Sequence, residues 1–255
     1  CLWAAGLGLR SGTAAWFGLA GLAAAFGHLA RADGLLLLGV VLLTVSFAPS
    51  RKINLSARLH SLAFCLLGYL AVMSPWLARN WMVSGAPLPG GGLQTLFLTT
   101  YDDMFAYGRP LTLDSYLAWG WGEILRSKLV AFGQNTMRLW VENFLIVLLP
   151  FSALGLWRLR RDPLLWPFLL YLPLLFLVMT IAFTLPGTRG GLYHSGGALL
   201  PFIFASTGPG LSVAVRWAAR HSAKAETISA AATMATANIC HARCACQPGH
   251  RRAAQ

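Results

Sequence analysis

Apolar residues in this chain gather into long blocks that are separated by short polar stretches. Six blocks have the composition of helices that cross a membrane, at roughly residues 13–30, 34–48, 60–78, 139–157, 164–185 and 198–215. A spanning helix needs about 20 mostly apolar residues, so the second and sixth blocks are expected to be ends of longer tilted helices or a re-entrant segment. The fifth block contains two prolines, which a packed bundle tolerates. The pattern predicts an all-α polytopic membrane protein.

The composition agrees with this fold class. The 255 residues are 56% hydrophobic and only 11% charged, whereas about a quarter of the residues in a soluble domain are charged. The net charge of +12 comes from short basic clusters between the apolar blocks. A nucleic-acid-binding protein would gather such residues on one soluble face. We therefore expect membrane lipids, and no nucleic acid, among the partners.

The basic clusters also predict how the chain is oriented. If RLRRD at residues 158–162 is cytoplasmic, alternation places four other basic groups on the same side, at residue 10, residues 51–58, residues 216–220 and the C-terminal tail. The opposite side receives the RADG turn, the long segment 79–138 and the stretch GTRGGLYHSGGA. Short loops then follow the positive-inside rule. The long segment 79–138 is expected outside the cytoplasm.

Part of that long segment has the spacing of an amphipathic helix. Apolar residues recur at near-helical intervals from Leu113 to Leu125, opposed by charged residues from Asp114 to Lys128. Thr112 is suited to be the N-cap, with an acid in the first turn. The sequence predicts a helix that lies in the outer membrane interface, or one that packs on the protein's own bundle.

The two ends of the chain differ from its middle. CLWAAGLGLR resembles the end of a helix already under way, and no signal-peptide arrangement is present, so we expect a fragment that lacks an N-terminal part. Residues 1–220 are expected to form the helical bundle, and residues 221–255 a disordered cytoplasmic tail. Cys240, Cys244 and Cys246 of that tail lack the paired Cys-x2-Cys spacing of a convincing zinc site.

Three polar stretches carry candidate chemistry, and the first follows the third block. In SPWLARNWMVSGAPLPGGG, the block ends on Trp76, which suits the interface, and then exposes Arg79 and Asn80. The arginine is either an anchor whose charge reaches the interface or a guanidinium that grips a phosphate.

The second stretch, PGTRGGLYHSGGALLPF, places Arg189, Tyr193, His194 and Ser195 in a glycine-rich turn between the last two blocks. Glycines allow a backbone to approach a ligand closely, and these side chains suit a phosphate or a sugar hydroxyl. The alternative is an ordinary loop with one anchoring arginine.

The third stretch, TTYDDMFAYGRP, contains Asp102 and Asp103. A carboxylate there is a candidate base or ligand of a divalent ion; the alternative is a solvated loop whose aspartate caps a short helix. Elsewhere, Arg31 and Asp33 of HLARADGLLLL flank a turn and are expected to pair with each other in a structural role.

Together these stretches resemble a known family. MSPWLARNWMVSGAPLP resembles the Pro-Trp-x-x-Arg-Asn-x-x-x-x-Gly-x-Pro segment of bacterial family 39-like glycosyltransferases, the polytopic group that includes relatives of dolichyl-phosphate-mannose protein mannosyltransferase. HLARADGLLLL and TRGGLYHSGGALLP resemble that group's helix-end stretch and late turn. The likeness covers about residues 15–220.

The resemblance implies a membrane glycosyltransferase of the bacterial cytoplasmic membrane. Such enzymes pass a sugar from a polyprenyl-phosphate donor to an acceptor outside the cytoplasm. Arg79, Asn80 and Arg189 are then the candidates for the donor phosphate, and Tyr193 and His194 for the sugar or phosphate. No cofactor is expected, although a divalent metal is compatible with the family. The family's catalytic acid normally lies near the chain's start, in a region absent here, so the fragment alone is expected to be inactive.

Two other classes remain open from the residues alone. A transporter or permease is expected to show inverted repeats, broken helices and a charge at mid-membrane, yet none of the eight acidic residues lies in the middle of a block. A non-catalytic membrane scaffold would use every polar stretch as an interface anchor.

Overall fold

Every regular element that the structure describes is a helix. The computed structural model describes residues 1–48, 54–88, 94–106 and 108–221. The chain divides into two compact units, Cys1–Gly210 and Leu211–Gln255. The zinc and tail hypotheses concern residues 222–255 and lie outside the described residues, except that residue 221, the first of the expected tail, is still helical. Within the described residues Cys1 and Cys65 are free thiols.

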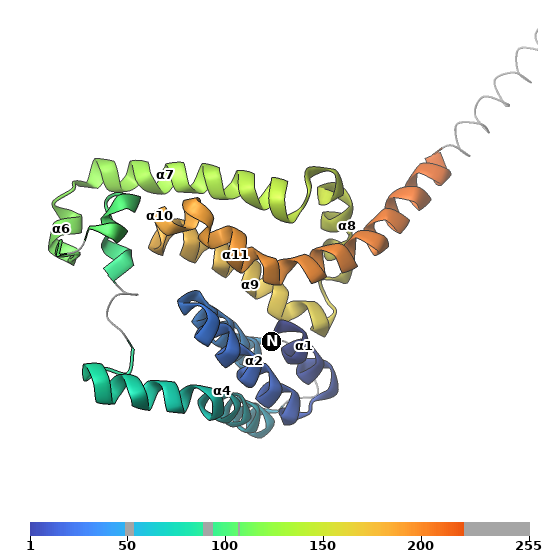
Figure 1. Cartoon of the computed structure of the whole chain (residues 1–255). Coiled ribbons are helices and arrows are strands. Elements are labelled where there is room, and N and C mark those ends of the chain that lie inside the picture. Colours follow the sequence, from blue (N-terminus) through green and yellow to red (C-terminus); the bar gives the residue numbers. More distant parts are fainter. Residues whose placement is uncertain (49–53, 89–93, 107, 222–255) are drawn as a thin grey trace, which may run out of the picture. The chain divides into compact units, whose positions relative to one another are not determined.

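The N-terminal part of the first unit consists of α1 (Leu2–Ser11), α2 (Ala14–Ala30), α3 (Leu35–Phe47) and α4 (Leu55–Ser84). Helix α2 packs along α4, as Figure 1 shows. Small residues let the two backbones approach closely, because a Cβ at Gly21 would lie 1.9 Å from the carbonyl oxygen of Cys65. Close contact through small residues is typical of helices in membranes.

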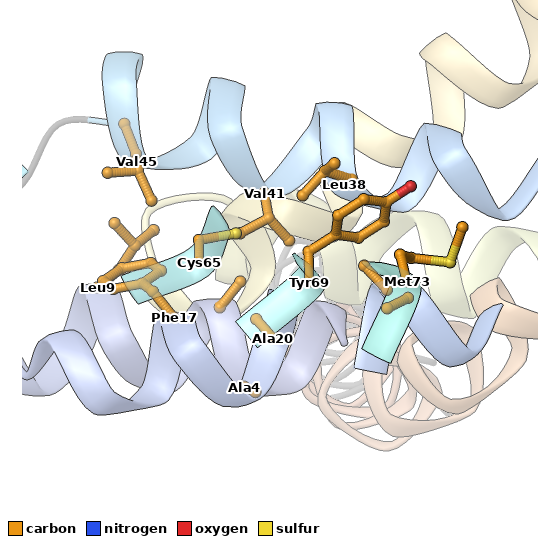
Figure 2. Packing of buried hydrophobic residues seen from close by; sticks show 14 residues of the cluster. Ala4, Leu9, Phe17, Ala20, Leu38, Val41, Val45, Cys65, Tyr69 and Met73 are labelled. Atoms are coloured by element: carbon orange, nitrogen blue, oxygen red, sulfur yellow. The ribbon is translucent and has the colours of Figure 1, made fainter. Parts of the chain in front are cut away.

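The side chains between these helices form one apolar cluster. Cys65 and Met73 of α4 are fully buried there, with Phe17 of α2 and Val41 of α3. Figure 2 shows the α4 side chains among those of α2 and α3. The cluster holds the N-terminal helices together, so the turn between α2 and α3 has a fixed place relative to α4.

The second half begins with a helix that is interrupted. Thr112 caps α6 (Leu113–Leu117), where its hydroxyl accepts a hydrogen bond from the Ser115 amide at 3.2 Å, so the expected N-cap is confirmed. The predicted amphipathic helix does not continue unbroken, because Gly120 has a φ of 95°. A new helix, α7 (Trp121–Arg138), starts after it.

The expected fourth block, 139–157, is not one helix. A π-helical turn Leu139–Asn143 follows α7, and α8 (Leu149–Leu159) begins only after Leu145 and Ile146, which have positive φ angles. The two helical parts, Trp121–Asn143 and Ile146–Leu159, are bent by 82°. Pro150 lies in the first turn of α8, where a proline is tolerated but cannot continue a preceding helix.

The last two blocks form an antiparallel pair. The elements are α9 (Trp166–Leu177), the π-helical turns Val178–Ala182 and Gly187–Gly191, α10 (Thr184–Pro186) between them, α11 (Leu192–Gly196), the turn Gly197–Leu199 and helical residues from 200 onward. Phe168 stacks on Phe202 with ring centroids 5.1 Å apart. Helix α7 packs against this pair, as Figure 1 shows.

The chain is an all-α membrane protein. Among the described residues three helices are long and apolar enough to cross a membrane, namely Leu55–Ser84, Pro163–Ala182 and Thr184–His221. A fourth crossing results if the two bent helical parts, Trp121–Asn143 and Ile146–Leu159, form one span. Two further apolar helices, Ala14–Ala30 and Ala32–Phe47, are shorter than that limit. The prediction of six spans therefore stays a prediction.

Candidate functional site

The turn between α2 and α3 joins distant parts of the chain. Arg31 donates from Nε to Asp33 at 3.1 Å, as the expected pair. Ser195 also donates its hydroxyl hydrogen to Asp33, although 162 positions separate them. Tyr171 of α9 donates to the backbone oxygen of Ser195 at 3.2 Å. A carboxylate that was expected only to bond its neighbour therefore also fixes the late glycine-rich turn.

Close to this turn, the last part of α2 contacts the C-terminal half of α4. His28, near the end of α2, has its ring 6.1 Å from that of Trp76. Its Nδ1 lies 2.6 Å from the hydroxyl oxygen of Tyr69. Trp76 belongs to the Pro-Trp stretch and His28 to HLARADG. The three stretches that carry the family resemblance thus meet around one turn, through a ring contact on one side and the Ser195 hydrogen bond on the other.

The late turn itself is built on glycines. Gly190 has a φ of 130°, which favours glycine. Gly196 lies against Asn143, because a Cβ there would be 2.7 Å from the Asn143 Nδ2 atom, which donates to the Gly196 oxygen at 3.1 Å. Tyr193 and His194 are exposed and have ring centroids 5.3 Å apart. Both candidate rings are therefore open to a ligand.

Arg189 precedes these rings and lies over another candidate stretch. Its guanidinium carbon is 5.0 Å from the centroid of the Tyr101 ring, within the range of a cation–π contact. The side chain is exposed, and no ion pair to a carboxylate is found for it among the described residues. Its charge is therefore available to an anion.

Arg79 and Asn80 differ in exposure. Asn80 is buried and donates from Nδ2 to the backbone oxygen of Pro87 at 3.3 Å, so its amide holds the chain as it leaves α4. Arg79 is exposed, and its only hydrogen bond in the described residues is a long one of 3.5 Å to Asn80. No hydrogen bond, ion pair or ring contact links Arg79 to Arg189 in the described part of the chain.

The two aspartates of TTYDDMFAYGRP also differ. Asp103 is 4% exposed and pairs with Arg109; its Oδ2 accepts from the amides of Thr99 and Thr100. Burial raises the pKa of Asp103, but the hydrogen bonds from Thr100 and Thr99 outweigh it and lower the pKa from 3.8 to about 2. Its oxygens are thus occupied by the chain, and the capping alternative fits it best. Asp102 is exposed.

A groove of about 320 Å³ lies between α7 and the segment 184–189. It is lined by Arg189 and by residues that the sequence analysis did not single out as candidates: Trp119, Glu123, Arg126, Ser127, Val130, Ala131, Gln134, Thr184, Leu185 and Thr188. The spacing of Glu123, Ser127 and Gln134 follows one flank of a helix. The helical spacing of these residues could be recognised in the sequence, but their packing against residues 184–189 could not be predicted from it.

The groove is held in place by contacts on both sides. Lys128 donates to the Thr184 hydroxyl and lies 5.5 Å from the centroid of the Tyr116 ring. Farther along α7, Asn135 is buried and donates from Nδ2 to the backbone oxygen of Met179 at 3.3 Å. Of the two expected environments for this helix, packing on the protein's own bundle is therefore present. Its opposite face exposes Trp121, Leu125 and Leu129.

No group of three or more His, Cys, Asp or Glu side chains among the described residues is arranged to hold a metal ion. No family model, no curated protein and no solved structure matches this chain. The candidate site therefore has to be interpreted from its own geometry.

Proposed function

We propose that this chain belongs to a membrane glycosyltransferase that transfers a sugar from a polyprenyl-phosphate donor to an acceptor outside the bacterial cytoplasmic membrane. The observation that carries the proposal is the meeting of the three family-like stretches around the α2–α3 turn, through Trp76 on His28 and Ser195 on Asp33. Stretches that share one site in a family are expected to meet in space, and these are distant in sequence.

The exposed arginines have the chemistry that such a donor requires. In the transfer, the bond between the anomeric carbon and the phosphate oxygen breaks, and a bond from that carbon to the acceptor oxygen forms. Negative charge develops on the departing phosphate, which a guanidinium stabilises. Arg79 and Arg189 are the proposed phosphate partners, because both are exposed and neither is ion-paired among the described residues.

The acceptor hydroxyl must also lose its proton. Asp102 is the proposed recipient within the described residues, because it is exposed and follows Tyr101, whose ring lies under Arg189. Asp103 is a poorer candidate, because its oxygens already accept hydrogen bonds from Thr99 and Thr100. The proposed role of Asn80 is to hold the chain where it leaves α4. Tyr193 and His194 would line the binding site for the sugar or the phosphate.

The test is sugar transfer by the complete protein in bacterial membrane vesicles supplied with radiolabelled polyprenyl-phosphate sugars. We expect Arg79→Ala and Arg189→Ala to lower transfer by at least 100-fold, about 3 kcal/mol, as for the loss of a group that stabilises developing charge. Arg160→Ala is the matched control, because Arg160 also stacks on an aromatic ring, that of Trp157, but lies in the basic RLRRD cluster.

Two results would argue against the proposal. Transfer that both arginine variants leave intact would reduce these residues to anchors while keeping the enzyme class. No transfer from any polyprenyl-phosphate donor by a correctly inserted protein would favour the transporter.

A further inference from the structure

We propose that the groove between α7 and residues 184–189 binds an anionic saccharide, with one sugar ring and one phosphate or carboxylate group. The groove lies outside the α2–α3 turn but shares Arg189 with the proposed donor site. Only the further step, that the saccharide is the acceptor of the transfer, rests on the proposed function. At about 320 Å³, the groove is near the lower limit for small-ligand pockets. A single sugar ring with its charged group suits that size better than an oligosaccharide does.

The charges of the groove favour an anion. Two arginines, Arg126 and Arg189, line it with a single acid, Glu123. Arg126 lies 3.5 Å from Glu123, but the two side chains are 74% and 50% exposed, and an exposed pair of this kind is weak. A ligand phosphate can therefore replace the carboxylate. Lys128 does not line the groove, but it adds a third cation next to it, because it donates to the hydroxyl of the lining residue Thr184.

The uncharged lining suits a sugar ring. Trp119 is half-buried at the edge of the groove, and its ring is supported by that of Tyr116 at 6.2 Å. Ser127 and Thr188 donate their hydroxyl hydrogens to backbone oxygens of their own helical segments, so their oxygens remain acceptors for sugar hydroxyls. The side chain of Gln134 makes no hydrogen bond within the described ranges and offers both an amide donor and an acceptor.

The cationic and sugar-binding side chains of the groove come from two segments that are distant in the sequence and pack together. Trp119, Arg126 and Gln134 come from the α6–α7 region, whereas Arg189 comes from the turn after α10. Arg189 also leads directly into the turn that Ser195 fixes on Asp33. A saccharide in the groove would thus lie next to the segment that carries the proposed donor contacts, as the acceptor of a transfer reaction must.

The experiment measures binding of glucose 1-phosphate to the complete protein in phosphatidylcholine nanodiscs, by calorimetry, with inorganic phosphate and glucose as the two partial ligands. We expect glucose 1-phosphate to bind at least 10-fold more tightly than either. Arg126→Ala should weaken it at least 10-fold. Trp119→Ala should abolish the advantage of glucose 1-phosphate over inorganic phosphate. Arg79→Ala should leave binding unchanged while it abolishes transfer.

The outcomes separate the two proposals. Binding that depends on Trp119 and Arg126, in a protein that transfers no sugar, would support the groove and contradict the enzyme. If the protein transfers sugar, but its Arg126→Ala and Trp119→Ala variants bind glucose 1-phosphate as tightly as wild type, the proposed saccharide site in the groove is wrong. The proposed enzyme activity would stand. Equal binding of inorganic phosphate would reduce the groove to an anion site. Loss of binding when phosphatidylglycerol is added to the nanodiscs would assign it to a lipid headgroup instead.

Discussion

At the scale of single residues, the clearest distinction in the site lies between two neighbouring aspartates. Asp102 is exposed, whereas Asp103 is buried and accepts from two backbone amides and a threonine hydroxyl. Sequence alone gave both the same prediction, since adjacent acids look alike in a polar loop. Which of them faces inward depends on the backbone of the turn, in particular on the Thr100 cap.

Asp103→Asn is expected to loosen the segment 99–105 locally. An amide accepts less strongly than a carboxylate and leaves Arg109 without its partner, so the cost is roughly 1–3 kcal/mol. The measurement is hydrogen exchange at the Thr99 and Thr100 amides, which should exchange faster by about 10- to 100-fold. Asp102→Asn is the control and should leave those amides protected. Equal protection in both variants would contradict the structural role of Asp103.

The pH dependence of this contact follows from its lowered pKa. A carboxylate whose pKa falls from 3.8 to about 2 on folding stabilises the folded state above pH 3.8, and that contribution is lost as the pH falls towards 2. Protection of the Thr99 and Thr100 amides, corrected for intrinsic exchange, should therefore stay constant between pH 7 and pH 5. A decline within that range would mean that another group controls the segment.

At the scale of elements, the sequence predicted helices well where one apolar block is one helix. The expected blocks 13–30 and 34–48 correspond closely to α2, Ala14–Ala30, and α3, Leu35–Phe47. The block 139–157 was wrong as a single helix, because hydrophobicity does not report the backbone break at Leu145 and Ile146. The pair of Arg31 and Asp33 was predictable from its spacing, whereas the contact of Ser195 with Asp33 depends on the packing of helices far apart in sequence.

The crossing of α2 and α4 gives a prediction at this scale. A Cβ at Gly21 would lie 1.9 Å from the Cys65 oxygen, whereas a Cβ at Gly39 in α3 meets nothing within 4 Å. Gly21→Ala should therefore separate the helices and cost roughly 1–3 kcal/mol. Gly39→Ala, the matched control, should be neutral or stabilise its helix by up to about 1 kcal/mol. Thermal unfolding in detergent, followed by circular dichroism, measures both; a Gly21→Ala protein as stable as wild type would contradict this crossing.

At the scale of the whole molecule, the contacts around the α2–α3 turn constrain how the chain crosses the membrane. Helix α4 has 30 residues, so at 1.5 Å per residue it is about 45 Å long, more than the roughly 30 Å of a hydrocarbon core. A helix of this length can therefore place Arg79, which lies near its end, outside the hydrocarbon core. Because Trp76 contacts His28 and Ser195 contacts Asp33, the end of α4 and the late turn must lie on one side of the membrane.

This requirement can be tested without any assumption about function. The complete protein, with the five cysteines of this chain and any others replaced by alanine, would carry Ser84→Cys, Gly197→Cys or Arg160→Cys and be labelled with a membrane-impermeant maleimide. Ser84→Cys and Gly197→Cys should react alike in intact cells, since both positions are exposed and follow residues, Trp76 and Ser195, that make the contacts around the turn. Arg160→Cys should react only after permeabilisation, because the connection through α9 leads to the opposite side. Labelling of the Ser84 and Gly197 variants from opposite sides would mean that the α2–α3 turn does not join these stretches, and the proposed donor site would lose the contact on which it rests.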